Sequence, residues 1–326
     1  TRTPVVTRVQ HLLAKKTRTE WRGPRSGYTA KYGSARDFPW RRDMTPRCIW
    51  PAKALLGEGP MWSARESAVY WVDIMAPSVH RYSLQDGSRC TWSMPEPIGW
   101  IIERRGREGF IAGFKSGFAE LTLEPLSIRL FARPEPQLPG NRLNDAKADD
   151  RGRIWAGSMD EAERAASGSL YRIDPDLAWS RVDSGYCVAN GPTLSPDGRV
   201  FYHTDSALRT IYRFDLLPSG ELVHKRVWVA LEEGAYPDGM TTDAEGGVWV
   251  AVWGGSCVRR FTPEGRETHR IELPASQVTS CVFGGAKLDR LFVTTAAMGT
   301  KEEPEAGALF EVSPGFHGLP SALFAG

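Results

Sequence analysis

The sequence predicts an all-β protein and, more specifically, a six-bladed β-propeller. No segment sustains the 3.6-residue apolar period of a long helix, whereas a short alternating strand preceded by a turn rich in Gly and Asp recurs six times. Aromatic residues in successive copies are about 40 to 48 residues apart, which is the length of one four-stranded blade. These residues are Tyr70, Phe110, Trp155, Phe201, Trp249 and Phe292.

Each copy is followed by a second hairpin signal, in which two strand-like runs flank an Asp or Pro-Gly turn. Two hairpins per repeat supply the four strands of a blade. The first hairpin of each repeat contains SARESAVYWVD, ERRGREGFIAG, DDRGRIWAGSM, SPDGRVFYHTD, DAEGGVWVAVW or AKLDRLFVTTA, in chain order. The second is recognised in VHRYSLQDGS, LYRIDPD, IYRFDLLPSGEL and VRRFTPEGRE.

The two ends of the chain have separate expectations. The GALFEV segment around Leu309 is expected to pair with strands from the beginning of the patterned region, closing the ring and removing free sheet edges. Thr1–Asp43 has no apolar period and is interpreted as a flexible or non-native extension, which leaves residues 44–326 for the propeller. The DEAERAA stretch around Glu161 is expected to form one short helical turn on a surface loop.

Composition favours a protein that acts on a small molecule. The 41 basic and 39 acidic side chains give a net charge of +2, so no single-sign field favours nucleic acid or an anionic membrane. Five cysteines without a CxxC pair predict neither a disulfide framework nor a cysteine-rich zinc site. No apolar run is long enough to span a bilayer. We therefore expect a cytoplasmic protein, monomeric or weakly oligomeric, with neither a nucleic-acid nor a membrane partner.

Several catalytic motifs are missing from the sequence. There is no G-x-S-x-G elbow, no H-E-x-x-H motif, no phosphate-binding glycine loop and no G-x-G-x-x-G sequence after a strand. The six histidines are scattered, with no pair at ligand spacing, and are expected to be structural or surface residues. These absences disfavour serine-nucleophile and nucleotide chemistry.

Polar residues in Gly- and Pro-containing turns recur at one phase of the repeat. They are Glu58 in LGEGPMW, Arg142 and Asn144 in NRLNDAK, Asn190 in VANGPTLS and Asp238 in YPDGMTTD. The rotation of a propeller would bring all five to the same end of the central channel. Asn-Gly and Asp-Gly are also ordinary turn dipeptides, so the common phase, rather than any single residue, supports a site.

The oxygen ligands in this set predict one bound divalent metal ion. Glu58, Asn190 and Asp238 supply carboxylate and amide oxygens, which favour Ca²⁺, Mg²⁺ or Mn²⁺ and also permit Zn²⁺ or Fe²⁺.

At these residues the sequence resembles the SMP-30/gluconolactonase/LRE-like family, which includes the regucalcins. The segments LGEGPMW, NRLNDAKADDRGRIWAGSM, ANGPTLSPDGRVFYHTDS and YPDGMTTDAEGGVWVA carry the resemblance, in this order. It implies a six-bladed propeller with one catalytic divalent metal, for which Glu58, Asn190 and Asp238 match the ligands. Arg142 and Asn144 match substrate-binding residues, and Asn144 also lies near the metal or its water in this resemblance.

Two features of the sequence depart from the family pattern or leave it open. Ala146 and Ala189 replace residues that are commonly Gly and Ser, and neither change removes a ligand. In some relatives the loop at residues 160–168 supplies an acidic contact to the substrate, for which this chain offers Asp160, Glu161 and Glu163.

We expect a metal-dependent hydrolase that opens a sugar lactone, with Asp238 as both ligand and general base. An organophosphate hydrolase is one alternative, because a cation also polarises a phosphoryl oxygen. A non-enzymatic calcium-binding propeller is another. Arg142 discriminates against the latter, since a purely structural metal does not need a buried cation beside it.

Overall fold

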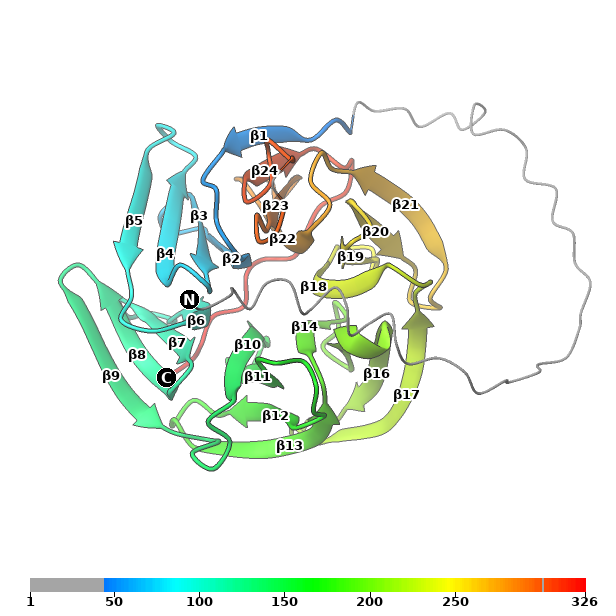
Figure 1. Cartoon of the computed structure of the whole chain (residues 1–326). Helices are drawn as coiled ribbons and strands as arrows, with labels where there is room; N and C mark the ends of the chain where they lie inside the picture. The colour runs from blue at the N-terminus through cyan, green and yellow to red at the C-terminus, as the bar shows by residue number, and fades with distance from the viewer. Residues whose placement is uncertain (1–43, 301) are drawn as a thin grey trace, which may run out of the picture. The chain divides into compact units, whose positions relative to one another are not determined.

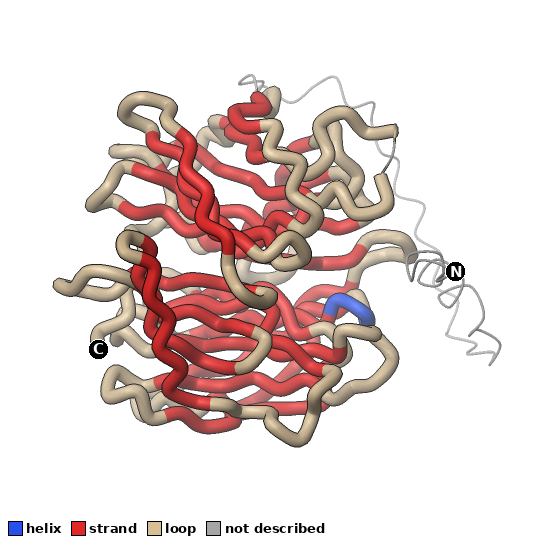
Figure 2. Tube along the Cα trace, turned by 60° about the vertical axis from the view of Figure 1, so that its left-hand side comes forward, coloured by secondary structure: helices blue, strands red, loops and turns tan. Residues whose placement is uncertain are grey.

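The computed structural model describes residues 44–300 and 302–326, which form six four-stranded sheets arranged in a ring (Figure 1). All neighbouring strands within a sheet are antiparallel, which confirms the predicted six-bladed propeller. Strands dominate the described residues, in which the one helical element is a short 3₁₀ turn, η2 (Ser206–Leu208), shown in blue in Figure 2. The prediction for Thr1–Asp43 lies outside the described residues.

The first strand of each blade lies at the centre of the ring and lines the channel (Figure 1). Neighbouring first strands contact one another around the ring, and their side chains are mostly buried. We call the end of the channel where these strands begin the upper end, and the other the lower end. The first strands are β2 (Gly57–Ser63), β6 (Ile98–Glu103), β10 (Asn141–Ala148), β14 (Ala189–Leu194), β18 (Tyr236–Thr242) and β22 (Val278–Gly284).

The second strand of each blade contains the aromatic residue that defined the repeat. Trp155, Phe201, Trp249 and Phe292 are fully buried between neighbouring sheets, so the recurring aromatic marks the core of the propeller. Burying each such ring contributes roughly 1.5–3 kcal/mol. The second strands are β3 (Ala68–Asp73), β7 (Phe110–Phe114), β11 (Ile154–Asp160), β15 (Val200–Asp205), β19 (Val248–Trp253) and β23 (Arg290–Thr295).

The third and fourth strands complete each blade and form its outer edge. Burial decreases outward: the fourth strands alternate exposed and partly buried residues, as expected for a sheet edge that faces solvent. The third strands are β4 (Ser78–Ser83), β8 (Gly117–Leu123), β12 (Gly168–Ile173), β16 (Thr210–Leu216), β20 (Cys257–Phe261) and β24 (Leu309–Val312). The fourth strands are β5 (Arg89–Ser93), β9 (Leu126–Ala132), β13 (Trp179–Tyr186), β17 (Leu222–Ala230), β21 (Glu267–Glu272) and β1 (Arg47–Trp50).

The ring is closed by pairing between the two ends of the described chain. β1 is the fourth strand of the last blade, where Cys48 pairs with Phe310 of β24. The Glu311 carboxylate of β24 forms ion pairs with Arg47 of β1 at 2.7 Å and with Arg290 of β23 at 2.5 Å. The predicted closure by the segment around Leu309 is confirmed.

After β24 the chain runs across the lower end of the channel (Figure 1). This C-terminal segment (residues 316–326) is fastened by hydrogen bonds to five separate blades. Gly318 N–H donates to the Leu288 carbonyl at 2.7 Å, and Ser321 Oγ donates to the Trp62 carbonyl at 2.8 Å. Near the end of the segment, Phe324 is fully buried, and its backbone N–H donates to the Glu103 carbonyl. The other contacts are Ala244 N–H to the His317 carbonyl and Ala325 N–H to the Gly152 carbonyl.

Two blades preserve the same side-chain network in the turn before the second strand. Asp149 accepts a hydrogen bond from the Trp155 indole at 2.9 Å, and Asp243 accepts one from the Trp249 indole at 2.8 Å. In both cases a buried arginine also pairs with the carboxylate. The matching contacts show that the repeat seen in DDRGRIW and DAEGGVW is also structural.

The five cysteines at positions 48, 90, 187, 257 and 281 are all free. In residues 44–300 and 302–326, no helix has the length and apolar character needed to cross a bilayer.

Candidate active site

All five residues expected at the site lie on first strands, in the upper half of the channel. Glu58 belongs to β2, Arg142 and Asn144 to β10, Asn190 to β14 and Asp238 to β18. Each has at most 7% of its surface exposed. Four different blades therefore contribute polar groups to one buried place.

A β-bulge in every first strand gives these residues their orientation. A bulge leaves residues unpaired and turns their side chains away from the regular alternation of the strand. Glu58 and Asn190 end the regular pairing, whereas Asn144 and Asp238 are themselves bulged. The register shifts are Glu58/Met61, Ile98/Trp100, Leu143/Ala146, Asn190/Thr193, Pro237/Met240 and Val278/Ser280.

Two buried carboxylates, those of Glu58 and Asp238, act on each other electrostatically across the channel. Burial, together with repulsion from neighbouring carboxylates, raises the pKa of Glu58 to about 8 and the pKa of Asp238 well above its usual range. Gly59 N–H donates to Glu58 at 3.0 Å. The site thus holds excess negative potential that its own residues do not neutralise.

Asn190 is oriented by a relay of hydrogen bonds. Its Nδ2 donates to Ser206 Oγ at 3.1 Å, and this hydroxyl donates to the Pro237 carbonyl at 2.6 Å. The amide oxygen is thereby turned away from the relay and has no hydrogen-bond partner. Asp238 Oδ1 is also buried without a partner. Leaving such an acceptor unsatisfied costs roughly 1–3 kcal/mol, which a bound cation would offset.

Arg142 and Asn144 are held together, on the same side of β10. Arg142 Nη1 donates to Asn144 Oδ1 and, at 3.2 Å, to the Leu143 carbonyl. Asn144 Nδ2 donates to the Ala189 carbonyl at 2.9 Å on the neighbouring blade. Burial lowers the pKa of Arg142, although nearby carboxylates oppose that effect. No described residue accepts a hydrogen bond from Arg142 Nε or Nη2, so these donors are free for a ligand.

Asp145 is a member of the site that the sequence prediction did not select. It follows Asn144 in the bulge, is buried, and accepts a hydrogen bond from the backbone N–H of Ala146 at 2.7 Å. Its charge acts on both Glu58 and Asp238, and burial raises its own pKa. The available signal was its position beside Asn144 in a turn-like segment, where a bulge lets consecutive residues approach the same cavity.

The loop after β11 brings acidic residues toward Arg142. The Asp160 carboxylate accepts backbone N–H groups at positions 162, 164 and 165, and no helical turn forms, so the expected helix there is wrong. Both Glu161 and Glu163 act electrostatically on Arg142. Glu161 forms an ion pair with Lys115, whereas Glu163 also acts on Asp238. Of the three acidic residues left open by the sequence, Glu163 has the arrangement best suited to a ligand contact.

The donor set fits a hard divalent cation. Glu58, Asn190 and Asp238 offer oxygen ligands, which such cations prefer. The Asn190 amide oxygen and Asp238 Oδ1 lack hydrogen-bond partners, and the carboxyl groups of Glu58 and Asp238 have raised pKa values. In the part of the chain that is described, no three His, Cys, Asp or Glu side chains form a metal-binding group. The site therefore depends on the Asn190 amide to complete the ligand set.

The fold and the site define the chain as a six-bladed propeller with a buried, oxygen-lined binding site in its channel. The family model described as SMP-30/Gluconolactonase/LRE-like region matches residues 56–297, and the chain belongs to this family.

Relatives match this chain along nearly their whole length. A 6-deoxy-6-sulfogluconolactonase of Pseudomonas putida is 32% identical over 86% of this chain and 99% of its own. An L-arabinolactonase of Azospirillum brasilense is 33% identical over 83% of this chain and 92% of its own. A crystal structure of a calcium-binding protein, regucalcin, from Agrobacterium tumefaciens has a TM-score of 0.82 and 25% identity, covering 86% of this chain and 97% of that one.

Proposed function

We propose that this protein is a divalent-metal-dependent hydrolase that opens a sugar lactone to the corresponding aldonic acid. The main supporting observation is that two buried acceptor atoms without partners, on Asn190 and Asp238, lie close to a guanidinium with free donors. The lactonase names of the Pseudomonas and Azospirillum relatives support the substrate class.

Glu58, Asn190 and Asp238 would hold the metal ion through their oxygen atoms. When bound, a divalent cation would polarise the lactone carbonyl and lower the energy of negative charge on its oxygen. Arg142 and Asn144 would orient the sugar, since Arg142 Nε and Nη2 donate no hydrogen bond to any described residue and are free to bind it. A fixed, planar guanidinium suits neighbouring hydroxyls better than a single point charge does.

Asp238 would act as general base. Its raised pKa makes the ionised Asp238 carboxylate a better proton acceptor than an ordinary carboxylate. In the hydrolysis, a water oxygen bonds to the carbonyl carbon and the water's proton passes to Asp238. The ring C–O bond then breaks, and the departing oxygen takes up a proton to become the free hydroxyl of the aldonic acid.

The proposal is tested with metal-stripped protein and a panel of aldonolactones, to which Ca²⁺, Mg²⁺, Mn²⁺, Zn²⁺ or Fe²⁺ is returned one at a time. Hydrolysis should depend on the cation, and Asp238→Asn should lower kcat by roughly 10²-fold or more. Glu103→Gln is the matched control: Glu103 is also a buried carboxylate on a first strand, but it pairs with Arg65 at 2.9 Å.

Three results would contradict the proposal. Unchanged turnover in Asp238→Asn would remove the assigned base. Faster hydrolysis of a phosphotriester than of any lactone would favour an organophosphate hydrolase. Tight cation binding without hydrolysis of either substrate would favour a binding propeller.

A further inference from the structure

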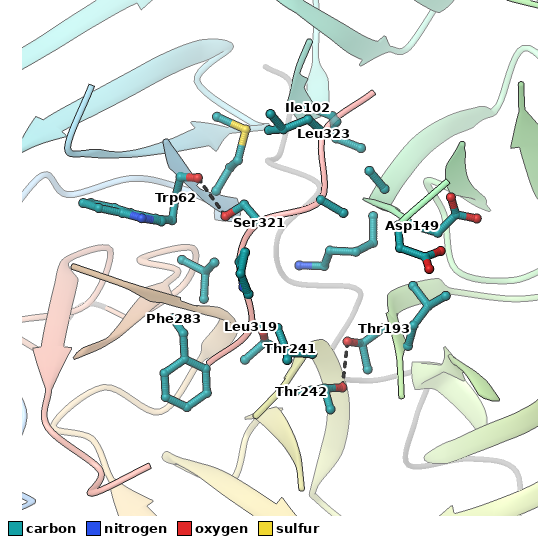
Figure 3. Close-up of a pocket in the computed structure, with 18 of the residues that line it drawn as sticks. Trp62, Ile102, Asp149, Thr193, Thr241, Thr242, Phe283, Leu319, Ser321 and Leu323 are labelled. Carbon is teal, nitrogen blue, oxygen red and sulfur yellow. Dashed lines mark hydrogen bonds between the residues drawn. The ribbon is translucent and has the colours of Figure 1, made fainter. Parts of the chain in front are cut away.

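A cavity of about 490 Å³ lies in the lower half of the channel, beyond Asp145 (Figure 3). Its walls come from the later residues of several first strands, including Lys147, Thr193 and Thr242. The C-terminal segment crosses it, and Leu319 and Leu323 belong to its lining. The cavity adjoins the proposed active site through Asp145, which lines it, whereas Glu58, Asn190 and Asp238 are not among its lining residues.

Lys147 places a positive charge in this cavity without a matching anion. Its side chain is half-buried, and in the described ranges its ammonium group forms no ion pair and no hydrogen bond. The ammonium therefore carries a charge that no described side chain neutralises by an ion pair. An anion that enters the cavity would be attracted to this charge.

The acidic residues of the lining do not neutralise Lys147. Asp149 is paired with Arg153 at 2.7 Å and accepts the Trp155 indole, so its charge is already satisfied. Asp150 is exposed at the rim. The Lys147 charge lowers the pKa of Asp145, but the Asp145 carboxylate accepts a hydrogen bond from the Ala146 backbone N–H and forms no ion pair with the ammonium.

Hydroxyl groups give the cavity further hydrogen-bonding capacity. Thr193 and Thr242 face each other across two blades, with their oxygens 3.0 Å apart (Figure 3). One hydroxyl of this pair donates to the other, which leaves the second hydrogen free. One ammonium with a nearby hydroxyl donor is the chemistry that recognises a compact oxyanion.

We propose that the lower cavity is a binding site for a small oxyanion, of the carboxylate or phosphate class, with Lys147 as its main contact. The fastening of the C-terminal segment to Trp62 and Glu103 keeps this site formed in the absence of a ligand. A preformed cavity reduces the ordering cost of binding.

The test uses the full chain and two probes, inorganic phosphate and acetate, titrated by calorimetry at constant ionic strength with chloride as the reference salt. Lys147→Met should weaken saturable binding about tenfold or more, because a charge-assisted hydrogen bond is lost. Lys147→Arg keeps the charge and should retain binding. Lys287→Met, an exposed lysine in a turn of the last blade that does not line the cavity, controls for net charge.

The relative affinities of the two probes identify whether a phosphate or a carboxylate is the better ligand. Lys147→Gln is a second neutral variant, should Lys147→Met fail to fold. Equal affinity in the wild type and the neutral variants, or no saturable binding of either probe, would overturn the proposal. Neither probe is a lactone, so the result is independent of whether the protein hydrolyses one.

Discussion

At the scale of single residues, a metal ion bound at the proposed site would compete with protons for the same oxygen atoms. Burial and mutual repulsion raise the pKa values of Glu58 and Asp238, so in the absence of a cation protons are retained there at unusually high pH. The oxygen atoms Asn190 Oδ1 and Asp238 Oδ1, which have no hydrogen-bond partner, belong to the same group of proposed metal ligands. Metal binding at this site should therefore release protons and strengthen as pH rises.

The first residue-scale prediction concerns stability without metal. Because the folded protein holds a proton on Glu58 up to a pH of about 8, whereas the unfolded chain releases it near 4.5, the carboxyl favours folding at low pH. That contribution is lost as pH rises toward 8, which lowers the free energy of unfolding by up to roughly 1.4 kcal/mol per pH unit. Melting temperatures of metal-stripped protein should fall between about 6.5 and about 8.

This pH window is chosen because two buried histidines act in the opposite direction at lower pH. Burial lowers the pKa of His80 to about 4 and that of His203 to about 3, so both favour folding more strongly as pH rises toward 6.5. Glu58→Gln should flatten the fall above 6.5 and leave the histidine contribution unchanged. Identical pH profiles for the wild type and Glu58→Gln would contradict the assignment.

A second prediction at this scale is that Arg142→Lys impairs substrate binding far more than metal binding. Lysine keeps the charge but loses the fork of donors that remains free in the structure. We expect kcat/KM for a lactone to fall about tenfold or more, corresponding to roughly 1.4 kcal/mol. Cation affinity, measured by calorimetry on the same sample, should change little. A comparable loss of cation affinity would show that Arg142 organises the metal ligands instead.

At the scale of secondary-structure elements, the bulged first strands place the site, and glycine allows them to approach one another. Gly191 follows Asn190 with a φ of 37°, and a Cβ atom there would lie 2.4 Å from the Asp238 carbonyl oxygen. The strand that carries Asn190 thus packs directly on the strand that carries Asp238. The spacing between two proposed ligands depends on the absence of a side chain at this position.

Gly191→Ala should separate these two strands and damage the site. Left-handed backbone alone costs an alanine roughly 1–2 kcal/mol, and the contact with the Asp238 carbonyl adds to this. Gly106→Ala is the control, because Gly106 has a φ of 67° but nothing within 4 Å of its Cβ position. Chemical denaturation and cation titration of both variants provide the measurement. Equal effects of the two substitutions would show that the close approach is unimportant.

The elements also show how far sequence reasoning extends. The recurring aromatics and turn dipeptides predicted the blades, and the common phase of Glu58, Asn190 and Asp238 placed them on equivalent strands. An alternating sequence pattern does not reveal where the strand register shifts. It could therefore not predict that Asn144 and Asp145 lie together in one bulge. The electrostatic effect of Glu163 on Arg142 depends on a loop conformation that is set by hydrogen bonds rather than by periodicity.

At the scale of the whole molecule, the C-terminal segment joins five of the six blades by crossing the lower end of the channel. It has no alternating pattern, so the sequence did not predict its path across the channel. Phe324 is its most buried residue and packs among Ile102, Leu143 and Ile154, which belong to blades two and three. Loss of this contact should weaken the fold and open the lower cavity together.

Phe324→Ala should destabilise the protein by about 3–5 kcal/mol, as expected for removal of a buried aromatic side chain. Leu208→Ala serves as the control, because 58% of Leu208 is exposed. Urea denaturation measures the stability, and limited proteolysis followed by mass spectrometry tests whether cleavage near residues 316–326 increases. A small loss of stability without new cleavage would mean that the polar fastenings alone hold the segment.

The pairing of β1 with β24 also determines the order in which the protein can fold as it is synthesised. Arg47 and Glu311, which face each other in the closing sheet, are 264 positions apart in the chain. A ribosome makes β1 early, yet its partner emerges only after nearly every other strand. Until then β1 and β23 have open edges that can pair with another chain, so a nascent or truncated chain ending before Leu309 is the species most exposed to aggregation.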